Sequence, residues 1–141
     1  VKSFSKTGQR RDLNREKFEL DKLLLDLKNV DSCASKNLKY LSHAMKIRSK
    51  LTSFHPSSSM KCLSNDRSDI IAIQRGEGLN SVIAIHNFTE NKLDYSINTD
   101  EFNKNNGNNS FFKDYLSGKL HKNLNFVLNP FDVLWIGLDS K

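Results

Sequence analysis

The stretch from Leu38 to Pro56, LKYLSHAMKIRSKLTSFHP, marks the point where the hydrophobic period of the chain changes. Its first part has the spacing of an amphipathic helix, in which Leu38, Leu41 and Met45 fall on one line. The proline at its end favours a helix stop, because it restricts the residue before it to an extended conformation. The residues that follow have the two-residue period of β-strands. The sequence therefore predicts helices before Pro56 and an all-β module after it.

The residues that precede this stretch predict a second helix, over residues 19–28. Its leucines follow helical spacing and form one apolar stripe: Leu20, Leu23, Leu24 and Leu27. Either Asp31 or Ser32 is suited to cap the longer helix, at about 33–51, at its N-terminus. That longer helix has a wide apolar face, which is typical of a helix docked on a large body. Because the rest of the sequence offers no helical partner, we expect more protein upstream of this chain.

Six segments after Pro56 are short, rich in β-branched and aromatic residues, and separated by clusters of Asn, Gly, Asp and Ser. They are residues 60–64, 69–75, 80–89, 92–98, 123–129 and 131–138. Turn signals about every ten residues predict an antiparallel sheet or small sandwich of five to six strands that begins near Met60. Residues 103–110, NKNNGNNS, predict a polar loop. We therefore assign residues 1–56 and 57–141 to two different regions.

The charge of the chain, +6 from 22 basic and 16 acidic residues, raises the question of a nucleic-acid partner. The lysines are scattered from Lys2 to Lys141 rather than gathered on one helix face, and no nucleic-acid-binding motif accompanies them. A dispersed basic surface that aids solubility explains this pattern better. No apolar run approaches the ~20 residues of a membrane helix. We expect neither a nucleic-acid nor a membrane partner.

The cysteines and histidines show no pattern of a catalytic or metal site. Cys33 and Cys62 lack the spacing of metal ligands or of a redox motif, and two free thiols indicate a reducing cytoplasm. His43 and His86 have no Ser, Cys or carboxylate at a telling spacing, and His55 beside a proline turn is best explained as structural. The sequence contains no phosphate-binding loop, zinc signature or nucleophile elbow. We expect no catalytic residue, metal or cofactor in this chain.

The segment from Lys6 to Phe18, KTGQRRDLNREKF, is the strongest candidate for a ligand-binding site. It places three arginines, an aspartate and an asparagine within residues 10–15. Arginine side chains hold hydroxyls, carboxylates or phosphates in a fixed geometry, and Asp and Asn add acceptors and an amide. The alternative is a helix-capping region whose arginines pair with neighbouring acids such as Asp12 and Glu16. The residue types alone leave both interpretations open.

Four segments occur in an order that is similar to one enzyme family. They are TGQRRDLNREKFELDKLLLDL at residues 7–27, LKYLSHAMKIRSKLTSFHP at 38–56, VIAIHNFTEN at 82–91 and LNPFDVLWIGL at 128–138. Together they resemble the C-terminal third of sucrose phosphorylase-type enzymes, which belong to the α-amylase superfamily, glycoside hydrolase family 13. That family has an arginine-containing loop before its last barrel helices, an FHP segment that closes the barrel, and a final β-domain. This chain departs from the family pattern at Leu13, where Ile is usual, and at Phe131, where Tyr is common.

The resemblance implies both a fold and an activity. Residues 1–56 would be the end of a catalytic (β/α)8 TIM barrel, with its active-site loop and last helices, and residues 57–141 an antiparallel C-terminal β-domain, so that the chain is an α+β fragment. The activity would be that of a retaining α-glucosyl phosphorylase or transferase. In this reaction an aspartate attacks the anomeric carbon, a glutamate protonates the leaving group, and phosphate accepts the glucosyl unit.

The resemblance also implies partners and site residues. Sucrose or a related α-glucoside and inorganic phosphate would be the substrates, and glucose 1-phosphate the product. By motif, Arg11 would hold sugar hydroxyls in the glucosyl-binding subsite, while Asp12, Asn14 and Arg15 would shape the same loop. The catalytic carboxylates lie upstream in the family, so this chain alone should be inactive. The identity of the α-glucoside and the formation of a homo-oligomer stay open.

A function of another class stays open beside this one. The β-rich second half is also what a non-catalytic module would have. It would then be a carbohydrate-binding or scaffolding β-module attached to an amylase-type barrel.

Overall fold

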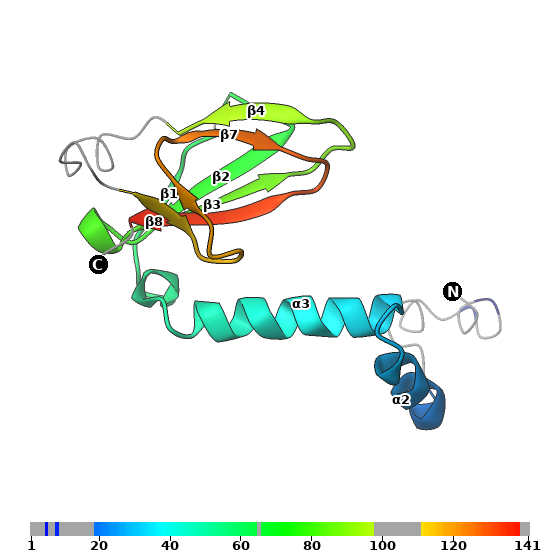
Figure 1. Ribbon diagram of the computed structural model, residues 1–141. Coiled ribbons are helices and arrows are strands. Elements are labelled where there is room, and N and C mark those ends of the chain that lie inside the picture. The colour runs from blue at the N-terminus through cyan, green and yellow to red at the C-terminus, as the bar shows by residue number, and fades with distance from the viewer. Residues whose placement is uncertain (1–4, 6–7, 9–18, 65, 98–110, 139–141) are drawn as a thin grey trace. The chain divides into compact units, whose positions relative to one another are not determined.

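The computed structural model of the protein describes residues 5, 8, 19–64, 66–97 and 111–138. In these residues two α-helices are followed by antiparallel β-structure, which confirms the predicted α+β class and the change near Pro56 (Figure 1). Contacts divide the chain into two compact units, Val1–Ser42 and His43–Lys141. Each strand pairing among the described residues is antiparallel, and all of these strands follow Pro56. The assignment of residues 1–56 to a barrel stays a prediction.

Helix α2 spans Leu20–Lys28 and helix α3 spans Cys33–Arg48. The backbone N–H of Ser35 donates a hydrogen bond of 3.0 Å to the Ser32 hydroxyl. Ser32 is therefore the N-cap of α3, as one of the two predicted alternatives has it. α3 ends at Arg48 rather than near Leu51, because the N–H groups of Lys50 and Leu51 donate to carbonyls three residues earlier in the chain, as in a 3₁₀ turn.

The apolar faces of the two helices are present as predicted, but the described part of the chain does not bury them. No residue of α2 or α3 is buried within it. The exposed large apolar side chains of these helices are Leu20, Leu24, Leu25, Leu38, Tyr40, Leu41 and Met45. Because burying such side chains is the main favourable term in folding, both helices have surface that further protein could cover.

The β-structure consists of a six-stranded sheet, in the order β1-β2-β3-β8-β5-β6, and a two-stranded sheet of β4 and β7. The strands are β1 Met60–Cys62, β2 Ile70–Arg75, β3 Val82–Asn87, β4 Leu93–Ser96, β5 Phe112–Asp114, β6 Leu120–His121, β7 Asn125–Leu128 and β8 Val133–Leu138. All six predicted strands are present, and the first begins at Met60 as expected. The β5–β6 hairpin is additional, so the predicted number of five to six strands was too low.

Asp114 explains why the sequence analysis missed this hairpin. Aspartate is depleted from strands and therefore indicates a loop. Here its buried carboxylate accepts hydrogen bonds from the backbone N–H groups of Leu116 and Ser117, each at 3.2 Å, and from that of Trp135 at 3.0 Å. The side chain that weakens the strand pattern thus organises the hairpin turn and ties it to β8.

The two sheets pack face to face, and their inner faces form one hydrophobic core (Figure 1). β3 contributes Ile83 and Ile85 to this core, and β7 contributes Phe126 and Leu128. Along β7, buried and exposed residues alternate, as expected of a strand with one face in a core and one in water. This β-module is therefore a two-layer sandwich, the second of the two architectures that the turn spacing predicts.

The outer face of the larger sheet is also largely apolar. On β3 the four consecutive residues Val82–Ile85 are buried, which departs from the alternation of a strand with one wet face. The Phe54 ring covers part of this outer face, because it lies against Trp135 of β8 with the ring centroids 4.7 Å apart. The segment that follows α3 is thus fixed to the β-module by an aromatic contact.

Replacing Gly137 by alanine is expected to destabilise the β-module. A Cβ atom at Gly137 would lie 2.6 Å from Cε2 of Tyr115 and 3.2 Å from the Ser81 carbonyl oxygen. A shift of the Tyr115 ring would disturb the hydrogen bond of 3.3 Å that its hydroxyl donates to the Leu138 carbonyl. Overpacking of this kind lowers the free energy of unfolding by about 1–3 kcal/mol.

Thermal unfolding of the Gly137→Ala variant checks this expectation. A loss of that size lowers Tm by roughly 4 °C or more in a unit of about 100 residues. Ser96→Ala, on the exposed side of β4, is the control and should melt with the parent protein. Equal Tm values for the two variants would show that a Cβ atom at position 137 does not clash with Tyr115.

Candidate functional site

The four residues predicted to bind substrate lie outside the described residues. They are Arg11, Asp12, Asn14 and Arg15, and their roles stay predictions. Residues 103–110, predicted as a polar loop, also lie outside. The other three segments of the resemblance fall within the described part of the chain, and the contacts between them can be followed residue by residue.

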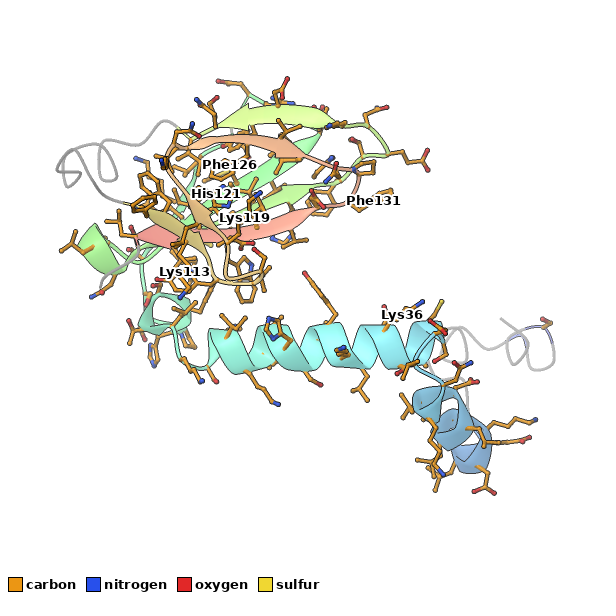
Figure 2. The ribbon with its side chains drawn as sticks, in the orientation of Figure 1. Lys36, Lys113, Lys119, His121, Phe126 and Phe131 are labelled. Carbon is orange, nitrogen blue, oxygen red and sulfur yellow. The ribbon has the colours of Figure 1, made fainter. Side chains whose placement is uncertain are left out.

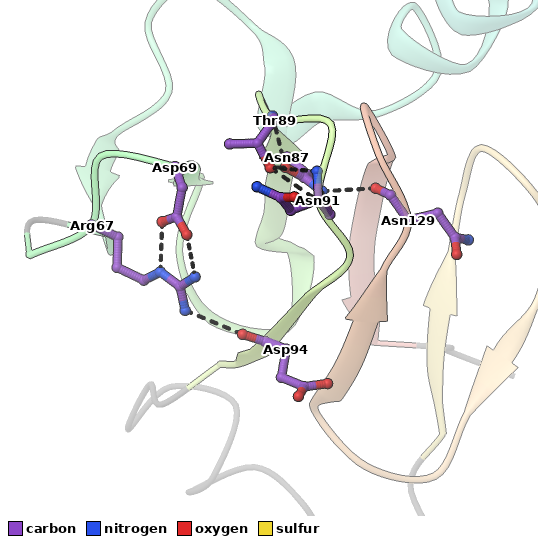
Figure 3. Close-up of polar contacts among 7 residues, drawn as sticks. All are labelled: Arg67, Asp69, Asn87, Thr89, Asn91, Asp94 and Asn129. Atoms are coloured by element: carbon purple, nitrogen blue, oxygen red, sulfur yellow. Dashed lines mark hydrogen bonds and ion pairs between the residues drawn. The ribbon is translucent and has the colours of Figure 1, made fainter.

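Asn87, in the segment VIAIHNFTEN, joins two loops at one end of the β-module (Figure 3). Its Nδ2 donates hydrogen bonds of 2.8 Å to the carbonyl oxygens of Asn91 and Asn129. Its Oδ1 accepts hydrogen bonds of 2.9 Å from the backbone N–H and the hydroxyl of Thr89. The side chain is buried, and these four bonds use both of its donors and both acceptor positions of its oxygen. The role of Asn87 in the structure is therefore to hold the loops together.

A tight turn at residues 129–132 completes this junction. The backbone N–H of Asp132 donates to the Asn129 carbonyl at 3.1 Å, and the Asp132 carboxylate accepts a bond of 2.7 Å from the Asn129 N–H. Pro130 occupies the second position of the turn, and Phe131 the third with φ of 60°. Glycine or asparagine is favoured at such a position, because a Cβ atom makes the left-handed conformation unfavourable. Phe131 is therefore held in a strained conformation.

A second polar cluster ties the two sheets together. Arg67 forms a two-pronged ion pair with Asp69, with its Nε and Nη2 at 2.8 and 2.6 Å from the carboxylate oxygens (Figure 3). Its Nη1 donates to the Asp94 carbonyl of β4 at 3.1 Å. The hydrogen bond from Arg67 lowers the pKa of Asp69 below its ordinary value of 3.8. Because each Arg67 nitrogen has a partner within the chain, the cluster is a structural clamp rather than a free anion site.

Two exposed phenylalanines lie beside the Asn87 junction. Phe88 follows β3 and Phe131 precedes β8, and more than half of each side chain is exposed. The His86 ring stacks on Phe88, with centroids 5.8 Å apart and the planes 17° from parallel. Figure 2 places Phe131 at the opposite end of the β-module from Lys113 of the β5–β6 hairpin. We call Phe88, Phe131 and the loops 87–92 and 129–132 the aromatic end.

Two histidines of the β-module have lowered pKa values. Burial lowers the pKa of His86 below its ordinary value of 6.5. His121 is lowered mainly by burial and also by the positive charge of Lys119, against the opposing effect of Asp114. The His121 ring packs edge-on against Phe126 at 5.1 Å, and its Nε2 is buried with no hydrogen-bond partner among the described residues (Figure 2). Both side chains therefore favour the neutral form in the folded protein.

Acidification is expected to destabilise the β-module through these histidines. Their folded pKa values lie below the unfolded value of 6.5, so unfolding takes up protons. Their contribution to stability is complete above pH 6.5 and is lost as the pH falls through the folded pKa values. Urea unfolding at pH 7 and pH 5 should show a lower free energy of unfolding at pH 5. In the double variant His86→Gln, His121→Gln, the free energy of unfolding should differ less between pH 7 and pH 5. If this difference stays as large as in the parent protein, the two histidines are not its cause.

The described residues were also compared with the side-chain groupings of metal and membrane sites. No three His, Cys, Asp or Glu side chains among them come together as a metal site would require. Cys33 and Cys62 are free thiols on the surface. No helix within the described ranges is long and apolar enough to cross a membrane. The polar clusters at Asn87, Arg67 and Asp114 are satisfied by the chain itself.

Sequence reasoning missed the junction at Asn87 and the Arg67–Asp69 pair. A signal for the first existed, since an asparagine followed two residues later by threonine favours a side-chain-stabilised turn. No comparable signal existed for the second, because its bond to Asp94 depends on how the two sheets stack. His55 is exposed, and its Nδ1 accepts a bond of 3.2 Å from the backbone N–H of Ser57, which fits the predicted structural role.

A scan against known protein families finds no match to this chain. A search of curated proteins finds no significant match either. Its function must therefore be inferred from the residues themselves and from the resemblance of their motifs.

Proposed function

We propose that this chain is the C-terminal part of a retaining α-glucosyl phosphorylase of the sucrose phosphorylase type. One observation carries the proposal: the motifs that suggest this family meet one another in space. Phe54 of the FHP segment packs on Trp135 of the VLWIGL segment, and Asn87 of the HNFT segment bonds to Asn129 of the NPF turn. Contacts thus join three segments that lie far apart in the sequence, and we take this as support for treating them as parts of one fold.

The uncovered leucine faces of α2 and α3 support the same proposal. Helices at the end of a (β/α)8 barrel pack one apolar face against the barrel strands and expose the other to water. A helix with an apolar stripe needs such a body to bury it. The barrel itself would supply the catalytic aspartate and glutamate, and the β-module would have no part in the chemistry.

In the proposed enzyme, the loop with Arg11 contacts the substrate. The arginine holds hydroxyls of the glucosyl unit in the donor subsite, and Asp12, Asn14 and Arg15 shape the loop around it. The aspartate nucleophile forms a glucosyl–enzyme intermediate, and phosphate then attacks the anomeric carbon to give glucose 1-phosphate. The exposed thiols of Cys33 and Cys62 are consistent with a cytoplasmic location, which is part of the proposal.

Phosphate-dependent cleavage of sucrose tests this function. The natural gene product that contains the chain is incubated with sucrose or other α-glucosides, with and without inorganic phosphate, and glucose 1-phosphate is measured. We expect product only when phosphate is present, and none from residues 1–141 alone. Failure to consume any α-glucoside in the presence of phosphate would contradict the proposal.

The exposed phenylalanines of the aromatic end favour a second candidate, a non-catalytic carbohydrate-binding module beside an amylase-type barrel. The reading frame upstream of Val1 separates the two candidates. A full barrel with an aspartate, a glutamate and a second aspartate at the ends of successive strands favours the phosphorylase. An unrelated upstream domain favours the module.

A further inference from the structure

The aromatic end presents two large apolar rings to solvent. Phe88 is 58 % exposed and Phe131 is 61 % exposed. They lie close together along the paired backbones of β3 and β8, because the register His86↔Val133 continues into a bond of 3.0 Å from the Asn87 N–H to the Asp132 carbonyl. A further bond of 3.2 Å joins the Phe131 N–H to the Thr89 carbonyl. The two rings therefore project from neighbouring, mutually bonded loops.

Hydrogen bonds hold the two loops that carry the rings. The buried Asn87 amide bonds to both loops, and the turn at Asn129 is closed from each side by Asp132. Phe131 keeps its left-handed conformation although asparagine or glycine would relieve the strain, and its ring gains little burial in return. An exposed aromatic ring fixed in a strained turn is best explained by a contact that the ring makes with a ligand.

The loops that carry the rings also contain the side-chain amides of Asn91 and Asn129. Only backbone atoms of Asn91 and the backbone of Asn129 take part in the bonds that join the loops, so both side-chain amides are available to a ligand. Figure 3 shows the Asn129 amide pointing away from the Asn87 junction. Glu90 and Lys92 carry opposite formal charges next to Asn91, and the Asp132 carboxylate accepts the Asn129 N–H, so the two loops have no excess of positive charge that would attract an anion.

We propose that Phe88 and Phe131, with the amides of Asn91 and Asn129, form a binding site for a neutral glucose oligosaccharide. The C–H groups on one face of a pyranose ring carry partial positive charge and pack against the negative face of an aromatic ring. Its hydroxyls at the ring edge match the donors and acceptors of an amide. The area of two exposed rings is small compared with the ~800 Å² that each partner buries in a stable protein interface, and this favours a sugar over a protein as the ligand. The site is independent of the proposed catalysis.

An NMR titration of the complete 141-residue chain tests the site. Maltohexaose and cellohexaose, added separately, serve as probes, and backbone amide shifts are followed. We expect shifts at residues 87–92 and 129–132 with at least one of the two sugars, at a Kd of about 1 mM, which is typical of a small exposed contact. Phe88→Ala and Phe131→Asn should each weaken binding about tenfold.

Two features of the design separate lost binding from lost folding. Asparagine tolerates the left-handed turn, so Phe131→Asn should keep the Tm of the parent or raise it. Val127→Ala removes an equally exposed apolar side chain from the other sheet and should bind like the parent. The proposal is overturned if neither sugar shifts the two loops, or if all three variants bind alike. It is also overturned if the loops shift with protein concentration alone, since the aromatic end would then be a contact between copies of the chain.

Discussion

Replacing Asn87 by aspartate is expected to lower the free energy of unfolding by at least about 3 kcal/mol at pH 7. The substitution keeps the shape of the side chain but removes its two N–H donors. The carbonyl oxygens of Asn91 and Asn129, now 2.8 Å from Nδ2, would then face a carboxylate oxygen without a proton between them. An unsatisfied buried polar group destabilises by about 1–3 kcal/mol, and a charged one by more.

The loss should depend on pH in a defined direction. The facing carbonyl oxygens raise the folded-state pKa of the introduced carboxyl, because the protonated form can donate one hydrogen bond. The loss in free energy of unfolding, relative to the parent protein, is therefore smallest near pH 4 and grows as the pH rises to 7. Comparing each variant with the parent at the same pH removes the effect of the native histidines.

Urea unfolding of three proteins provides the measurement. Asn125→Asp introduces the same side chain at an exposed position of β7 and is the matched control, with an expected change below about 0.5 kcal/mol. If both variants lose the same stability, or if the loss at Asn87 is the same at pH 4 and pH 7, the junction does not depend on the donors of Asn87.

Replacing Arg11 by lysine in the full-length gene product is expected to reduce kcat/KM roughly ten- to hundredfold with every glucosyl donor. The reason is geometric, since lysine keeps the positive charge but lacks the planar group that can bind two hydroxyls at once. One hydrogen bond to a charged group contributes about 1.5–3 kcal/mol, which corresponds to a change of this size. Initial rates with sucrose and phosphate give the value.

Arg10→Lys is the control for this prediction. It changes the neighbouring arginine in the same way, and we expect normal turnover from it. If the arginines instead pair with acids such as Asp12 and Glu16 to cap a helix, the pattern is reversed. Tm would fall in Arg11→Lys while the folded enzyme keeps its normal activity, and that result would end the ligand interpretation of Arg11.

The parts of the fold that depend on local sequence could be predicted. The leucine spacing predicted α2, Ser32 was one of two predicted caps of α3, and the alternation after Pro56 predicted six strands and the start of the sheet at Met60. The β5–β6 hairpin was missed because Asp114, a residue that disfavours strands, is satisfied there by backbone groups from the turn and from β8. Such bonds depend on tertiary contacts that no local pattern contains.

The candidate sites were less predictable than the fold. The resemblance predicts a binding site at Arg11, whereas the described residues indicate a structural junction at Asn87 and a candidate site at the aromatic end. Asn87 appeared in the sequence only as part of a motif, and its role became clear when β3 was paired with β8. Phe131 was noted as a departure from the family pattern, but its backbone conformation has no signature in the residue type itself.

The configuration of the sugar phosphate tests the central claim most directly. Phosphorus and proton NMR spectra of the natural gene product, incubated with sucrose and inorganic phosphate, identify both the product and its anomer. Two successive displacements at the anomeric carbon predict the α-anomer of glucose 1-phosphate, which retains the configuration of the donor. The β-anomer, or hydrolysis to free glucose with no sugar phosphate formed, would contradict the assignment of this chain to a retaining α-glucosyl phosphorylase.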